Sequence, residues 1–136
     1  MLDLCYNLTE ILVHCHNYNQ QAAPNMKIMK ERHSNNKIYF NEQSYTCKNH
    51  IIPIIKKHKV LNEHSKVLEV GCGFGGNLRP FLDLGCQVTG VDILESSIER
   101  AKIELNIKDR NNLKLIASDI YDINTFHHQF DVIIMK

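Results

Sequence analysis

Glycine is confined to one short stretch of this chain. All six glycines fall between residues 71 and 90, and four of them lie within residues 71–76. Because glycine lacks a Cβ, it permits backbone conformations and close approaches that other residues prevent. A chain of 136 residues with this distribution is expected to have one loop where the backbone turns sharply or approaches a ligand.

Strand-like and helix-like runs alternate around this loop. Apolar and β-branched runs predict strands over 66–70, 87–91, 113–117 and 130–135. Between the strands, Asn77 is expected to cap a helix that stops at Gly85, and apolar spacing marks a second helix near 94–105. This alternation predicts an α/β fold, a doubly wound parallel sheet with helices on both faces.

The chain divides near residue 43. In residues 1–43, apolar positions from Leu4 to Cys15 follow helical spacing and the rest is polar, so this N-terminal segment is predicted to be partly helical or poorly ordered. A regular domain is predicted over 44–136. It opens with a helix whose stripe contains Tyr45, Ile51, Ile52 and Ile55, and Pro53 should kink that helix or mark its start.

Charge and cysteine content exclude several classes of protein. Sixteen Lys+Arg against fifteen Asp+Glu give a net charge of +1, too balanced to indicate a nucleic-acid partner. The sequence contains no run of about 18 apolar residues, so no membrane span is predicted. The N-terminus lacks the basic region of a secretory signal. Five irregularly spaced cysteines favour reduced thiols and a cytoplasmic location.

No metal site is predicted either. Cys47 and His50 have a usable ligand spacing, but no second paired motif completes a set of four ligands.

Acidic residues stand where successive strands end. Glu69 precedes the glycine loop, and Asp92 follows Gly71 at a separation typical of a carboxylate that binds a ribose diol. Asp119 follows the third strand, where it can accept a hydrogen bond from an exocyclic amine. Because the carboxyl ends of parallel strands share one edge, these positions predict a nucleoside-shaped slot. For Asp119, a cap on the turn toward Tyr121 stays open as the structural alternative.

The residues at these strand ends resemble a known family. Glu69-Val70-Gly71-Cys72-Gly73-Phe74-Gly75 resembles the first signature of class I S-adenosylmethionine-dependent methyltransferases, an acidic residue followed by G-x-G-x-G. Asp92, Ser118-Asp119-Ile120 and Phe130-Asp131-Val132-Ile133-Ile134 resemble its later signatures in the same order. The resemblance covers about residues 44–136 and implies a Rossmann-like sheet ordered 3-2-1-4-5-7-6, of which strands 3-2-1-4 are present.

The resemblance implies S-adenosyl-L-methionine as the cofactor and methyl transfer to an acceptor, by default a small molecule. It also implies a set of cofactor-binding residues at the strand ends: Glu69, Gly71, Gly73, Gly75, Asp92, Ile93, Asp119 and Ile120. The glycines would line the methionine and ribose portions, and Glu69 would orient the loop or the amino group. Asp92 would bind the ribose hydroxyls beside Ile93, and Asp119 would face the adenine amine beside Ile120. No catalytic base is named, and Asp131 is interpreted as structural.

Two alternatives stay open. Gly71, Gly73 and Gly76 also satisfy G-x-G-x-x-G, the fingerprint of an NAD(P)- or FAD-binding oxidoreductase. The chain also stops after its fourth strand, so it is expected to be a truncated methyltransferase, or else an inactive cofactor-binding fragment or module. That fourth strand, 130–135, would form an exposed apolar sheet edge, which predicts poor solubility or inactivity for the chain alone.

Overall fold

The computed structural model describes residues 11–14, 35–123 and 129–135. In these residues one parallel five-stranded sheet is formed, with the strand order β1-β5-β2-β3-β4. The strands are β1 (Ile11–His14), β2 (Lys66–Val70), β3 (Gln87–Asp92), β4 (Leu113–Ala117) and β5 (Val132–Met135). When β2 to β5 are counted as strands one to four, the order is the predicted 3-2-1-4, and the α/β class is confirmed.

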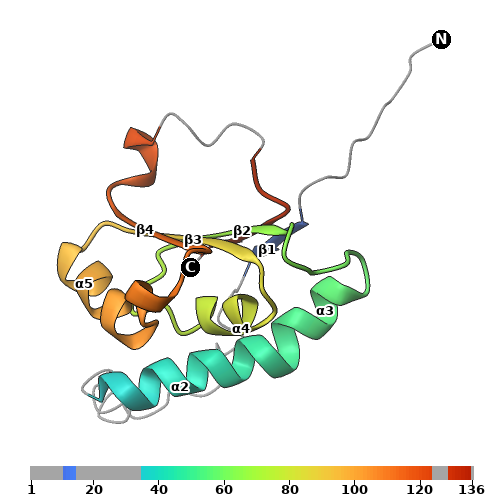
Figure 1. The fold of residues 1–136 in the computed structure, drawn as a ribbon, viewed down its shortest axis with the longest axis horizontal. Helices are drawn as coiled ribbons and strands as arrows, with labels where there is room; N and C mark the ends of the chain where they lie inside the picture. The colour runs from blue at the N-terminus through green and yellow to red at the C-terminus, as the bar shows by residue number, and fades with distance from the viewer. Residues whose placement is uncertain (1–10, 15–34, 124–128, 136) are drawn as a thin grey trace, which may run out of the picture.

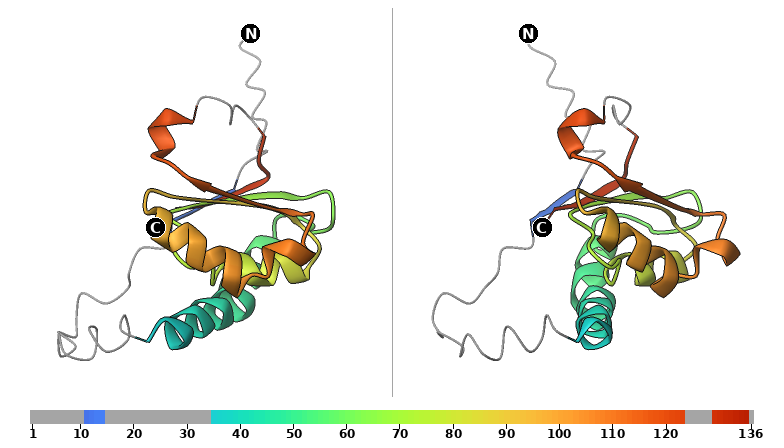
Figure 2. Two further views of the ribbon diagram at one scale, coloured as in Figure 1. Left: turned by 60° about the vertical axis from the view of Figure 1, so that its left-hand side comes forward. Right: turned by 90° about the vertical axis from the view of Figure 1, so that its left-hand side faces the viewer.

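The described α-helices lie on one face of this sheet (Figures 1 and 2). Helix α4 (Leu78–Asp83) joins β2 to β3, and α5 (Glu95–Glu104), followed by the 3-10 turn η2 (Ile107–Asp109), joins β3 to β4. Right-handed crossovers that advance in one direction place their helices on the same face.

The connection from β4 to β5 returns past β2 and β3 in the opposite direction. A right-handed connection in that direction lies on the face of the sheet opposite α4 and α5. The described part of this connection is the 3-10 turn η3 (Ile120–Asp122), which lies on that opposite face (Figure 1). Within the described residues, the helical cover predicted for both faces is thus concentrated on one.

A long helix with an irregular middle lies between β1 and β2 in the sequence. It consists of α2 (Asn36–Thr46), the π-helical turn η1 (Cys47–Ile51) and α3 (Ile52–Lys56). Pro53 lies in the first turn of α3, directly after the wider π turn, in which the Ile52 N–H bonds to the Cys47 carbonyl. The π turn gives the proline ring room that a regular α-helix would deny it. The predicted irregularity at Pro53 is therefore present, and the helix continues through it.

The predicted apolar stripe on this helix is only partly correct. Ile51, Ile52 and Ile55 are buried, but Tyr45 is 67% exposed. The π turn contains an extra residue relative to an α-helix, so it rotates the residues before it away from the face that packs on the sheet. The predicted boundary at residue 43 falls inside α2, and the division into two segments stays a prediction.

The N-terminal segment differs from its expected structure. Ile11–His14 form strand β1 where part of a helix was predicted, and the rest of that predicted helix lies outside the described residues. β1 pairs in parallel with β5, with Ile11 opposite Val132 and His14 opposite Met135. The prediction that β5 forms the sheet edge is therefore wrong. Helical spacing within a short window carries no information about a partner strand that is about 120 residues away.

The hydrophobic core lies between the sheet and the helices. It contains the inward side chains of β2, β3 and β5 and the apolar faces of α4, α5 and the long helix. Its largest fully buried members include Phe81, Ile55, Leu78, Ile98, Leu105 and Ile134. The three described cysteines, Cys47, Cys72 and Cys86, are also fully buried, and no disulfide joins them. Burial raises the pKa of the Cys86 thiol above its ordinary value.

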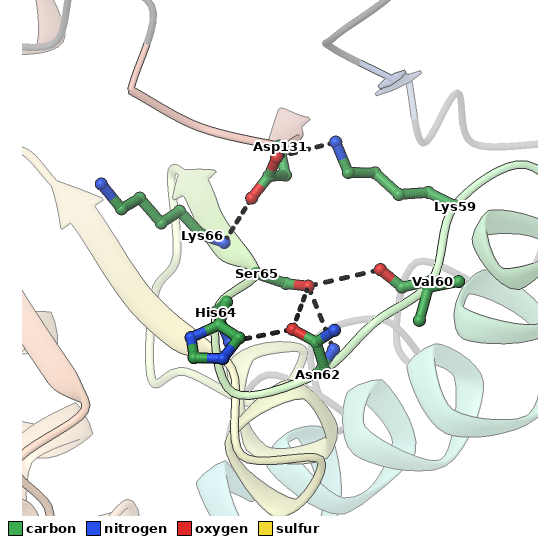
Figure 3. Close-up of polar contacts among 7 residues, drawn as sticks. All are labelled: Lys59, Val60, Asn62, His64, Ser65, Lys66 and Asp131. Atoms are coloured by element: carbon green, nitrogen blue, oxygen red, sulfur yellow. Dashed lines mark hydrogen bonds and ion pairs between the residues drawn. The ribbon is translucent and has the colours of Figure 1, made fainter.

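A polar cluster ties the loop after α3 to the amino ends of β2 and β5 (Figure 3). Asp131 accepts a hydrogen bond from the Lys66 N–H at 2.8 Å and forms an ion pair with Lys59 at 2.7 Å. In the loop, the Ser65 hydroxyl accepts from the Asn62 N–H at 3.0 Å. These contacts agree with the interpretation of Asp131 as structural.

None of the described helices is long and apolar enough to cross a bilayer.

Candidate functional site at the carboxyl edge of the sheet

The glycine loop follows β2 and turns back over the end of β3. The N–H groups of Gly71 and Cys72 both donate to the Val91 carbonyl, at 2.8 and 3.0 Å. Gly71, Gly73 and Gly75 have φ values of +73°, +54° and +81°. Residues with a side chain rarely adopt these angles, so this turn needs glycine.

The glycines of the loop have two different environments. A Cβ on Gly73 would meet no atom within 4 Å, so the loop is open there. A Cβ on Gly75 would lie 2.6 Å from Leu105 Cδ1, and one on Gly76 would lie 2.7 Å from the Phe40 carbonyl oxygen. Gly73 therefore leaves open space for a ligand, whereas Gly75 and Gly76 allow α5 and α2 to pack against the loop.

Asp92, at the end of β3, holds two backbone segments of the site. Its Oδ2 accepts from the Gly73 N–H at 2.8 Å, and its Oδ1 accepts from the Leu94 N–H at 3.0 Å. An ionised carboxylate offers about four lone-pair positions. Asp92 can therefore keep both backbone contacts and still accept hydrogen bonds from a ribose diol.

Asp119 lies next to Asp92 along the same edge. The Ser118 N–H donates to the Asp92 carbonyl at 3.0 Å, which places the two strand ends side by side. The Asp119 carboxylate accepts from the Tyr121 N–H at 3.0 Å and caps η3. The structural alternative for Asp119 is thus present, and the same side chain retains acceptor positions for a ligand amine.

Exposed apolar side chains surround these carboxylates. Ile93 is 68% exposed directly after Asp92, and the neighbouring Leu94 is also exposed. Ile120 is half-buried at the start of η3. Apolar surface beside hydrogen-bond acceptors suits a flat, partly polar ring such as a nucleobase.

Glu69 has a partner that sequence reasoning missed. The Glu69 carboxylate is fully buried on β2, and its Oε1 accepts from Asn77 Nδ2 at 2.8 Å. Asn77 was predicted to cap α4, but its side chain makes no capping bond and its backbone is already helical, with φ −72° and ψ −25°. The capping prediction is wrong because the Asn77 side chain turns toward the buried carboxylate instead.

Gln43 is a second residue without a sequence signal. It lies on α2, and a Cβ on Gly76 would be 2.7 Å from both its Cβ and its Oε1. Only the packing of α2 against the loop brings Gln43 here, so no local pattern could indicate it. No catalytic base was predicted, and His127 and His128, which precede β5 in the sequence, lie outside the described residues. Within the described part of the chain, no three His, Cys, Asp or Glu side chains gather as a metal site would require.

Comparisons with known proteins converge on this half of the chain. Residues 67–136, just over half of the chain, match the profile of a family described as a methyltransferase domain. Two uncharacterised proteins of Rickettsia prowazekii are 34% and 35% identical over 74 residues, which is 53% of this chain. The chain aligns with only 30% and 13% of the length of these relatives.

Solved structures show the same fold. PKMT2 from Rickettsia typhi, in complex with AdoHcy, is 35% identical with a TM-score of 0.50, covering 57% of this chain and 15% of that one. An S-adenosylmethionine-dependent methyltransferase from Aquifex aeolicus has a TM-score of 0.57 at 20% identity, covering 71% of this chain and 53% of that one.

Proposed function

This chain belongs to the methyltransferase-domain family, and from that premise we propose that it carries the cofactor-binding part of an enzyme that transfers a methyl group from S-adenosylmethionine to a small molecule. The resemblance to class I methyltransferases is confirmed by the family match and by the fold. AdoHcy, bound by the Rickettsia typhi relative, is what remains of S-adenosylmethionine after it gives up its methyl group, and this supports the predicted cofactor.

The convergence of three strand ends carries the proposal. The open position at Gly73, the Asp92 carboxylate and the Asp119 carboxylate come from the ends of β2, β3 and β4, and all lie at one edge of the sheet. These residues fit a nucleoside that continues into an amino-acid tail. The tail would lie against the glycine loop, the ribose at Asp92 and the adenine between Ile93 and Ile120.

The residues of the site would act mainly by positioning. Bound S-adenosylmethionine supplies an activated methyl group on a sulfonium, so the protein gains rate by holding donor and acceptor in line. Gly73 and Asp92 are linked by a hydrogen bond, so the ribose acceptor and the loop would keep one geometry relative to each other. The balanced net charge of +1 supports a small acceptor over a polyanion.

Isothermal titration of the full chain with S-adenosylhomocysteine and with NADH tests this proposal. We expect binding of S-adenosylhomocysteine and none of NADH. Asp92→Ala should weaken binding by about 1–3 kcal/mol, because ribose hydrogen bonds and the Gly73 contact are lost together. Asp109→Ala, an exposed residue of η2, is the matched control and should bind as the wild type does.

Other outcomes would point to the alternatives. Binding of NADH in place of S-adenosylhomocysteine would support an oxidoreductase and end the proposal. Tight binding of S-adenosylhomocysteine without methyl transfer to any of a panel of amine, thiol and hydroxyl acceptors would support a cofactor-binding module.

A further inference from the structure

One side-chain contact joins the two ends of the glycine loop. Glu69 is the second residue before Gly71, and Asn77 is the first residue after Gly76. The 2.8 Å hydrogen bond from Asn77 Nδ2 to Glu69 Oε1 therefore joins the two ends of the segment that contains all four loop glycines. We propose that Asn77 is a positioning residue for cofactor binding. Its hydrogen bond to Glu69 links the two ends of the glycine loop and so preorganises the loop.

Burial makes this contact strong. Glu69 is fully buried and Asn77 is 5% exposed, so water competes little for either partner. A buried acceptor that loses its hydrogen-bond donor is left with the full cost of its desolvation, so the contact is costly to remove. The contact also fixes Asn77, the residue directly before α4, relative to the Glu69 side chain on β2.

A loop with four glycines needs such support. Glycine-rich segments lose more conformational freedom on ordering than other segments, and a ligand that must order them binds more weakly. The middle of the loop is already attached to β3 through Gly73 and Asp92, and its start is attached through Gly71 and Val91. The contact between Asn77 and Glu69 adds the attachment at the end of the loop, where α4 begins.

This inference rests on the proposed function, and its test keeps the two separate. Titration of the wild-type chain with S-adenosylhomocysteine comes first, and failure to bind would contradict the proposed function. With binding established, Asn77→Ala should raise Kd about tenfold. Asn77→Asp should raise Kd further, because a second carboxylate would face Glu69 although its size is nearly unchanged.

The order of the two variants distinguishes positioning from packing. If Asn77 only filled space, Asn77→Ala would lower Tm more than Asn77→Asp does, because it leaves the larger cavity. In that case the Kd of both variants, measured well below the melting temperature, would stay at the wild-type value. The matched control is Asn112→Ala. Asn112 donates to the Cys86 carbonyl at 2.8 Å next to the amino end of β4, so its loss should lower Tm and leave Kd unchanged.

Hydrogen exchange without cofactor provides the second measurement. Both Asn77 variants should exchange faster in peptides that contain residues 71–76, while β4 keeps its protection. Faster exchange in β4 to the same extent would show general unfolding and would overturn the inference. Wild-type Kd in folded Asn77→Asp would overturn it as well.

Discussion

Gly73 and Gly76 lie three residues apart in one loop but serve different purposes. An added Cβ would meet no atom within 4 Å at Gly73, but would lie 2.7 Å from a backbone oxygen of α2 at Gly76. Backbone atoms cannot move aside as a flexible side chain can. The first glycine therefore keeps space for the ligand, and the second allows a helix to pack.

Paired alanine substitutions should separate these purposes. Gly76→Ala should lower the unfolding free energy by about 1–3 kcal/mol through overpacking and lower Tm accordingly. Gly73→Ala should cost about 1–2 kcal/mol of backbone strain at its positive φ, and should weaken S-adenosylhomocysteine binding more than Gly76→Ala does. Thermal melts and titrations of both variants provide the comparison. A larger loss of affinity in folded Gly76→Ala would contradict the assignment.

Asn77 and Asp119 show why residue roles are hard to predict from sequence. Both are residue types that cap helices, and both stand just before a helical turn. Asp119 does cap η3, whereas Asn77 uses its amide on buried Glu69. The choice depends on which buried partner the fold brings near, and no local pattern contains that information. The strand-end positions of Glu69 and Asp92 were predictable because they follow from strand–loop–helix alternation alone.

At the scale of elements, the ion pair between Lys59 and Asp131 joins the loop after α3 to the start of β5. Burial alone raises the pKa of this carboxyl, but the Lys59 ammonium, the Lys66 N–H and the charges of both lysines outweigh it and hold the pKa below its ordinary value. A carboxyl with a lower pKa in the folded state than in the unfolded state favours folding when it is ionised. That contribution is present above the unfolded pKa and is lost as the pH falls through the folded pKa.

The pH dependence of stability should reveal this contact. The difference in Tm between wild type and Asp131→Asn should be constant from about pH 7 to 5 and should shrink between about pH 4 and 3. Lys59→Met removes one cause of the lowered pKa, so the contribution of Asp131 to stability should be smaller in that variant and should be fully lost at a higher pH than in the wild type. A difference that persists unchanged to pH 3 would show that Asp131 contributes through packing.

Regular elements were the most predictable part of the fold. The four strands and the helices α4 and α5 lie close to their predicted positions because hydrophobic periodicity and glycine punctuation act locally. The register of the long helix was not predictable, because the π turn before Pro53 changes which residues face the core. Strand β1 was not predicted, because it forms by pairing with β5 at the other end of the chain.

At the scale of the whole molecule, β1 decides whether β5 presents an open edge. An unpaired strand offers a row of backbone donors and acceptors to other chains. With β1 in place, the outer side of β5 is already paired over four residues. The N-terminal segment thus completes the sheet beside the strand that would otherwise be its edge.

Removing this strand should change the association state. A variant that lacks residues 1–14 is expected to form concentration-dependent oligomers or aggregates, and light scattering coupled to size exclusion measures this. A variant that lacks only residues 1–10 keeps β1 and serves as the control, with the behaviour of the full chain. Equal association of both variants would show that β1 does not protect β5.

The burial of the three described cysteines gives the molecule built-in reporters of its own opening. Cys47 lies in the π turn, Cys72 in the glycine loop and Cys86 just before β3. A thiol reagent can reach each of them only after the surrounding structure has opened, and a raised pKa further slows the Cys86 thiol. Site-resolved labelling rates would therefore rank how readily the helix, the loop and the sheet open, without any engineered cysteine.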